Sequence, residues 1–429
     1  MAVAGTAALV ACTGVKKGGK GGAELRKGEM TMRTNPKDGS KVSILGYGCM
    51  RWPETEDENG RYALDQEQIN RLVDRALKAG VNYFDTSPVY CRGLSEKATG
   101  IALSRHPRES YAVATKMSNF SKYDFEAARS MYEKSMSELQ VDYIDYYLLH
   151  SLGGSREDFH SRFVDNGVLD FLLKEREAGR IRNLGFSFHG SPALFDYLME
   201  LHKKYHWDFV QIQMNYVDYN GDAKYLYEGL EKRGIPVVIM EPLLGGRLAK
   251  VPDFVGQQLQ QRDGSRSIAS WAFRFCGTFP GVLTVLSGMT YMEHLEDNLK
   301  SYSPLQPLGA EDMAFLSDTA VKLTKYPIVP CTDCRYCMPC PYGIDIPGIF
   351  AHYNRCVNEG DIAVEGDPSY RRARRRYLRS YSREVLPENQ ADKCISCGKC
   401  LPKCPQRIKI PSMMQRIDRY VEELKRGNF

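Results

Sequence analysis

Between residues 30 and 302, short runs of β-branched and aromatic residues alternate with longer stretches whose apolar residues recur at helical spacing. The short runs predict buried strands, and the longer stretches predict amphipathic helices that pack against them. Eight strands are predicted, at residues 43–48, 82–87, 111–117, 143–150, 181–188, 209–215, 236–242 and 282–288. Eight strand–helix repeats close a parallel barrel, so the predicted fold is a (β/α)8 TIM barrel.

The chain also predicts features on either side of this barrel. Before it, the runs 30–34 and 41–45 flank Asp38-Gly39 and predict a hairpin that plugs the barrel floor. After it, a helix over 311–324 leads into a cysteine-rich region. We therefore predict three parts: a signal-like or disordered segment (1–29), the barrel (30–308), and a linker helix with a mainly helical cysteine domain (309–429).

Residues 2–11 form an apolar run of small residues that ends at Cys12, and a lysine- and glycine-rich spacer follows. This resembles a bacterial lipoprotein signal with a lipidated cysteine. However, the run is short and no basic segment precedes it. The sequence leaves open whether this is a truncated signal or a chance match. The chain has no run of 18 apolar residues, so no membrane-spanning helix is predicted.

The composition is that of an ordinary globular protein, with 43% hydrophobic and 26% charged residues. The formal charge of +5 is unevenly spread, because residues 331–429 hold 18 Lys and Arg against 12 Asp and Glu, a charge of +6. Seven arginines between 371 and 383 concentrate this excess. A basic run can bind nucleic acid, but a solvated arginine face is the simpler interpretation, and we expect no nucleic-acid partner.

Four polar residues fall at or just after the ends of predicted strands, where barrel chemistry is usually located. Asp85 and Tyr90 follow the second strand, Lys116 ends the third, and His150 ends the fourth. Each alone could be a structural residue. Together they form a chemical set: Asp85 would keep the Lys116 ammonium charged, and the ammonium would lower the pKa of the Tyr90 phenol. A neutral His150 would orient the oxygen that receives the proton.

This set, with Gly46–Met50, Phe84–Ser87, Thr115-Lys116, Leu149-His150 and Gly185–Ser187, resembles the aldo-keto reductases over residues 30 to about 302. The resemblance implies hydride transfer between a nicotinamide cofactor and a small carbonyl or alcohol substrate. It also implies that Tyr90 is the general acid, that Lys116 and Asp85 tune it, and that His150 positions the carbonyl. The fold binds the dinucleotide without the G-x-G-x-x-G motif of a Rossmann domain, and the chain has no such motif.

The resemblance further implies a nicotinamide site. Its expected residues are Ser187, Gln211, Met240, Leu243, Gly245, Arg247 and Asn298. Gly245 would permit close approach of the pyrophosphate, and Arg247 would supply a cation. Met240 replaces a stacking tyrosine. Gly288 and His294 replace the Lys and Arg that usually hold a 2′-phosphate, so the choice between NADPH and NADH stays open.

Nine of the 13 cysteines lie in residues 331–429, and eight of these form two clusters. One cluster has the spacing of the bacterial ferredoxin run: Cys394, Cys397, Cys400 and Cys404. The other has one residue fewer before its last cysteine: Cys331, Cys334, Cys337 and Cys340. Such spacing predicts two [4Fe-4S] clusters, with the fourth cysteine of each run bound to the other cluster. Two zinc sites are the alternative. Cys356 fits neither cluster and is expected to be a buried apolar residue.

Clusters carry single electrons and nicotinamide carries a hydride, so the sequence leaves their coupling open. An electron-carrier protein is an expected partner. The alternative function is an electron carrier or redox sensor whose barrel only binds a ligand. Clusters are assembled in a reducing cytosol, so a cytoplasmic location is expected; the alternative is export in the folded state with an anchor at Cys12.

Overall fold

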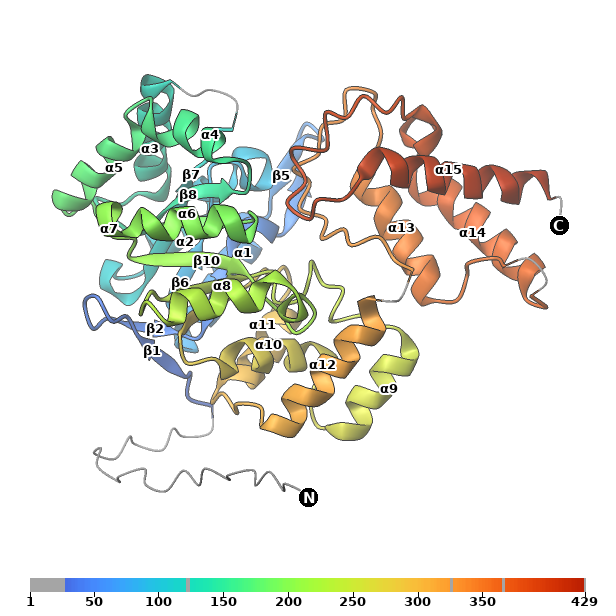
Figure 1. Ribbon diagram of the computed structural model, residues 1–429, viewed down its shortest axis with the longest axis horizontal. Coiled ribbons are helices and arrows are strands. Elements are labelled where there is room, and N and C mark those ends of the chain that lie inside the picture. Colours follow the sequence, from blue (N-terminus) through green and yellow to red (C-terminus); the bar gives the residue numbers. More distant parts are fainter. Residues whose placement is uncertain (1–27, 121–123, 325–326, 365–366, 428–429) are drawn as a thin grey trace, which may run out of the picture.

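The computed structural model describes residues 28–120, 124–324, 327–364 and 367–427. Eight parallel strands close a barrel in the order β10-β11-β12-β3-β6-β7-β8-β9, which confirms the predicted fold (Figure 1). The strands are β3 (Leu45–Gly48), β6 (Tyr83–Asp85), β7 (Ala112–Met117), β8 (Ile144–Leu152), β9 (Ile181–Phe188), β10 (Phe209–Gln213), β11 (Val237–Met240) and β12 (Val282–Ser287). The ring order follows the chain order, as right-handed strand–helix repeats require.

Helices surround the barrel and cover its outer face. They are α1 (Gln66–Lys78), α2 (Ser95–Leu103), α3 (Phe125–Leu139), α4 (Arg156–Phe159), α5 (Val168–Glu177), α6 (Pro192–Glu200), α7 (His202–Tyr205), α8 (Asp222–Glu231), α9 (Asp253–Arg262), α10 (Ile268–Thr278) and α11 (Met292–Tyr302). Helix α1 is typical: the Asp65 carboxylate caps its first turn by accepting the Gln68 amide, and Ile69, Leu72 and Val73 on one face are fully buried.

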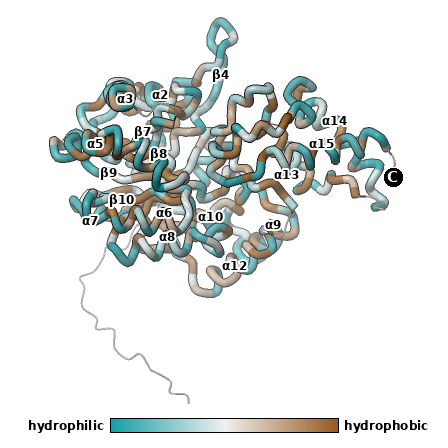
Figure 2. The backbone as a smooth tube through the Cα atoms, turned by 45° about the horizontal axis from the view of Figure 1, so that its top comes forward, coloured by the Kyte–Doolittle hydropathy of each residue, from teal (hydrophilic) through white to brown (hydrophobic). Residues whose placement is uncertain are grey.

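The predicted hairpin closes the barrel floor. Strands β1 (Met32–Thr34) and β2 (Lys41–Ser43) pair antiparallel. Val42 packs with barrel-interior residues, and the Asn35 amide donates to the Tyr146 hydroxyl at 3.1 Å. A second hairpin, β4 (Glu54–Glu56) with β5 (Tyr62–Leu64), was not predicted and projects from the barrel as a mainly hydrophilic arm (Figure 2).

The chain after the barrel forms a second, mainly helical body. Helix α12 (Ala310–Thr324) still packs on the barrel, with the Phe315 ring 5.9 Å from that of Trp271. Helices α13 (Ile346–Asn358), α14 (Tyr370–Glu384) and α15 (Ile410–Arg426) then enclose a separate hydrophobic core (Figure 1). The arginines of α14 lie mostly on its exposed side, since its buried residues are Ala373, Tyr377 and Tyr381.

Among the described residues, no helix is both long and apolar enough to span a membrane. The signal-like segment, including Cys12, falls outside the described residues.

Candidate active site and metal centres

A buried ion pair joins the ends of two neighbouring strands. Asp85 ends β6, and Lys116 lies in β7 with its side chain fully buried. The Lys116 ammonium donates to Asp85 Oδ1 at 2.6 Å and to the Thr86 carbonyl at 2.7 Å. Burial raises the pKa of Asp85, and the Lys116 charge opposes that shift. Buried charges of this kind persist only when paired, so each of the two residues holds the other in place.

Tyr90 lies over this pair, at the start of a 3-10 turn (Tyr90–Gly93) that follows β6. The Lys116 ammonium nitrogen is 4.8 Å from the centre of the Tyr90 ring. Burial, followed by the charge of Tyr336, raises the pKa of Tyr90 well above its ordinary value. The phenol is therefore neutral and carries its proton. The direction is opposite to the lowering by Lys116 that the sequence predicted, because burial dominates.

His150 faces Tyr90 across the end of β8. Its ring meets the Tyr90 ring edge-on, with 5.9 Å between centroids. Nδ1 lies 2.5 Å from the Ser118 hydroxyl, which leaves Nε2 as the nitrogen available to a ligand. Burial, with smaller effects from Lys116 and Arg162, lowers the pKa of His150 well below its usual range. The imidazole is neutral, as the sequence predicted.

Three of these four residues open onto one cavity of about 760 Å³ at the carboxyl ends of the strands. Asp85, Tyr90 and His150 line one part of it, and Lys116 lies behind them. Six of the seven predicted nicotinamide residues also line it: Ser187, Gln211, Met240, Leu243, Gly245 and Asn298. The Gln211 amide oxygen is buried and has no hydrogen-bond partner among the described residues, so it is an unused acceptor at the position implied for the nicotinamide carboxamide.

The structure places the seventh residue, Arg247, elsewhere. It does not line the cavity; its guanidinium interacts instead with the charges of Asp218, Cys331 and Glu241. Gly245, where φ is +67°, lies very close to the Thr332 backbone. A Cβ at this position would be only 2.3 Å from the Thr332 carbonyl oxygen. The loop carrying the first cysteines packs against this glycine.

Sequence reasoning missed several polar residues that line the same cavity, among them Arg51, His189, Glu241 and Tyr336. Glu241 follows β11 with a left-handed φ of 56°, and burial raises its pKa to about 7. Arg51 donates to the Thr332 carbonyl at 2.8 Å. Tyr336 lies within the first cysteine run, and that position was the one available signal that an aromatic residue accompanies the metal loop.

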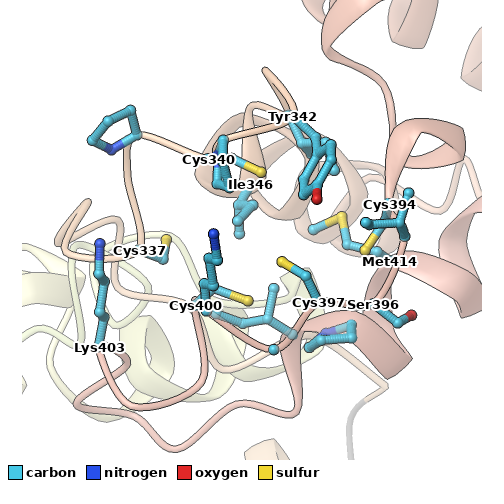
Figure 3. Close-up of a pocket in the computed structure, with 18 residues that line it drawn as sticks. Cys337, Cys340, Tyr342, Ile346, Cys394, Ser396, Cys397, Cys400, Lys403 and Met414 are labelled. Carbon is cyan, nitrogen blue, oxygen red and sulfur yellow. The ribbon is translucent and has the colours of Figure 1, made fainter.

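The eight clustered cysteines separate into two groups. One cavity is lined by Cys331, Cys334, Cys337 and Cys404, and a second by Cys340, Cys394, Cys397 and Cys400 together with Cys337. In Figure 3 the sulfur atoms of Cys340, Cys397 and Cys400 point toward a common space. The charges of the first group act on one another, and those of the second act on Cys400. Both groups offer the thiolate ligands that a [4Fe-4S] cluster requires.

The cysteine loops close over the mouth of the barrel. The side-chain amides of Gln213 and Gln406 exchange hydrogen bonds of 3.0 and 2.8 Å, and Arg407 donates to the His189 carbonyl at 3.0 Å. Cys334, Tyr336 and Pro405 contribute to the wall of the barrel cavity. The first cysteine group therefore lies against the polar residues at the strand ends, and we call it the proximal group; the second is the distal group.

Comparison with known proteins agrees with this architecture. Residues 44–319 match the aldo/keto reductase family, and residues 330–408 match a 4Fe-4S dicluster domain. L-galactose dehydrogenase of Arabidopsis thaliana is 26% identical over 311 residues, which cover 66% of this chain and 91% of that protein. Protein tas of Escherichia coli is 25% identical over 62% of this chain and 91% of its own length.

Two solved structures share the barrel fold. Aldo-keto reductase AKR11C1 from Bacillus halodurans, in its holo form, has a TM-score of 0.54 and 23% identity over 68% of this chain and 96% of its own. An aldo/keto reductase from Klebsiella pneumoniae, solved with NADP and acetate, has a TM-score of 0.55 and 20% identity over 68% of this chain and 95% of its own. The chain thus belongs to the aldo/keto reductase family and carries a 4Fe-4S dicluster domain after its barrel.

Proposed function

We propose that the barrel transfers a hydride between a nicotinamide cofactor and a small carbonyl or alcohol, and that the eight clustered cysteines bind two [4Fe-4S] clusters. The observation that carries the first part is the grouping of Asp85, Lys116, Tyr90 and His150 at one end of one cavity. A neutral buried phenol beside a buried ammonium is an arrangement suited to giving a proton to an oxygen that is gaining negative charge.

The four side chains divide the work on the carbonyl. A bound reduced nicotinamide would supply the hydride that the carbonyl carbon accepts. Tyr90 donates its proton to the carbonyl oxygen, which completes the alcohol. The Lys116 ammonium then stabilises the phenolate left on Tyr90, and Asp85 keeps that ammonium charged. His150 offers Nε2 toward the carbonyl oxygen and fixes its orientation, because Ser118 holds Nδ1.

The far end of the cavity favours NADH over NADPH. Its wall there carries Glu293, His294 and Asp297, and no lysine lines the cavity in the part of the chain that the structure describes. A 2′-phosphate would meet two carboxylates without a strong cation, whereas a ribose hydroxyl can donate to a carboxylate. Arg51 is the one arginine on the described wall, and its guanidinium is occupied by the Thr332 carbonyl.

Titration of the holoprotein with NADH and NADPH, followed by fluorescence, tests the proposal. We expect saturable binding of both, with NADH bound about tenfold more tightly, because one mispaired charged contact costs about 1.4 kcal/mol or more. Equal affinities would contradict the assignment of the cavity's far end. If neither nucleotide binds while the clusters are loaded, the reductase function is wrong and the electron-carrier or redox-sensor alternative replaces it.

An acidic electron carrier is the partner proposed for the distal group. Cys397 is exposed, and Ile395 and Leu401 beside it are 60% and 44% exposed. Lys399 and Lys403 line the same cavity and form no ion pair among the described residues. An apolar patch that adjoins unpaired cations, next to the site of electron exchange, suits the transient docking of a protein of opposite charge.

Replacing both lysines tests this surface. With a reduced acidic ferredoxin as the probe, K399E/K403E is expected to slow cluster reduction at least tenfold at low ionic strength, and salt should narrow the difference. Lys203 and Lys232 are exposed on the barrel, so K203E/K232E changes the net charge equally and should react at the wild-type rate. Photoreduced 5-deazariboflavin should reduce all three proteins alike. Equal rates with ferredoxin in all three proteins would refute this docking site.

A further inference from the structure

Tyr336 brings a side chain of the cysteine domain into the barrel cavity. It lies between Cys334 and Cys337, two of the cysteines of the proximal group. It nevertheless lines the cavity that holds Tyr90 and His150. Its ring meets the His150 ring edge-on, with 6.1 Å between centroids. A residue of the cluster-binding loop is therefore part of the wall at the end of the cavity where the proposed chemistry occurs.

The hydroxyl of Tyr336 lies at the two groups that are proposed to hold the substrate oxygen. It lies 3.2 Å from Nε2 of His150, and it is near enough to the Tyr90 phenol for the two groups to influence each other's pKa. A carbonyl oxygen held by Nε2 of His150 and facing Tyr90 would need the same position, because a hydrogen bond fixes its distance from Nε2 near 3 Å. The Tyr336 oxygen and a substrate oxygen therefore exclude each other.

The backbone that precedes this tyrosine is held in place, and so is a neighbouring loop. The Thr332 carbonyl accepts from Arg51 at 2.8 Å and lies so close to Gly245 that a Cβ would clash. The Gln213–Gln406 pair fixes the neighbouring loop of the cysteine domain. The side chain can change rotamer while these backbone contacts persist, because its torsions are independent of them.

We propose that Tyr336 is a gate: its hydroxyl occupies the carbonyl-oxygen position in the resting protein, and its side chain swings away when a carbonyl or alcohol binds. The gate rests on the proposed function, since Tyr90 and His150 define that position. Because Tyr336 lies between two ligands of one cluster, its movement changes the surroundings of that cluster. Ligand binding in the barrel and the reduction potential of the proximal cluster are then linked, and linkage is reciprocal.

Equilibrium binding of benzaldehyde to the holoprotein, measured by calorimetry, tests the gate without turnover. Y336F removes the competing hydroxyl, and Y336A also removes the ring. We expect Y336F to bind benzaldehyde about tenfold more tightly than the wild type, because benzaldehyde no longer has to displace the hydrogen bond between Tyr336 and His150. Y336A should bind benzaldehyde at least as tightly as Y336F. Tyr342, which lines the distal cavity, supplies matched controls, and Y342F and Y342A should keep the wild-type affinity. Unchanged or weaker binding in both Tyr336 variants would overturn the gate.

The linkage has its own readout in the redox behaviour of the clusters. Titrations followed by electron paramagnetic resonance, with and without benzyl alcohol, should show a ligand-dependent potential for one cluster in the wild type and no such dependence in Y336A. If the reduction potentials of both wild-type clusters are the same with and without benzyl alcohol, the linkage is refuted. Neither measurement uses nicotinamide, so failure of the proposed function would appear separately, as absent nucleotide binding, while these results would still decide the gate.

Discussion

Y90F is expected to lower kcat for carbonyl reduction by about 100- to 10,000-fold while leaving the Kd for NADH unchanged. The substitution removes the proposed proton donor and keeps the ring that lies against Lys116 and His150. The hydroxyl interacts with Tyr336 and not with any predicted nicotinamide residue, so cofactor binding has no reason to weaken. Steady-state kinetics and a fluorescence titration on the same preparation measure both quantities.

The matched control for this variant is Y216F. Tyr216 is also buried, and its hydroxyl has no hydrogen-bond partner among the described residues. Removing that hydroxyl should leave kcat within about twofold, because substitutions that touch neither the site nor a satisfied polar group have small effects. Turnover by Y90F at more than about a tenth of the wild-type rate would contradict the proton-donor role.

The barrel could be predicted because its signal is local and repeated. Each predicted strand overlaps an observed one, and the largest differences are at strand ends, as at β6, where residues 82–87 were predicted and Tyr83–Asp85 form the strand. Thr86 and Ser87 leave the strand, and their hydroxyls bond Ser95, the first residue of α2, and Ser118, which follows β7. The β4–β5 hairpin was missed because both strands are only three residues long and neither shows hydrophobic alternation: β4 is exposed and polar, and β5 is a half-buried Tyr-Ala-Leu run.

The candidate site was predictable where strand ends carry it and unpredictable where the second domain contributes to it. Asp85, Lys116 and His150 follow apolar runs, and that placement brings them together. The position of Arg247 outside the cavity was not predictable, because nothing in a single sequence indicates that Thr332 packs over Gly245. Tyr336 is 186 residues from its contact His150, and such long-range contacts leave no periodic pattern in the chain.

Substitutions that test the cysteine pairing are also expected to have a large effect, because they remove or keep a whole [4Fe-4S] cluster. In the proposed arrangement Cys331 and Cys404 bind one cluster, and Cys340 binds the other. C331A/C404A therefore damages only the proximal cluster and should keep about four of the eight irons in one intact [4Fe-4S] cluster. C331A/C340A removes one ligand from each cluster and should leave neither intact.

These two double variants separate the crossed pairing from one in which each run of cysteines binds its own cluster. If the runs were independent, the results would exchange: C331A/C340A would keep one intact cluster and C331A/C404A would keep none. Iron content and the resonance spectrum of the reduced protein distinguish these outcomes. C356A is the control, because Cys356 is buried in the helical core beside His352, away from both cysteine cavities, and its loss should leave both clusters in place. The crossed pairing joins residues 331 and 404, so it also ties the two cysteine loops together over the barrel mouth, and C331A/C404A should release Tyr336 from its position beside His150.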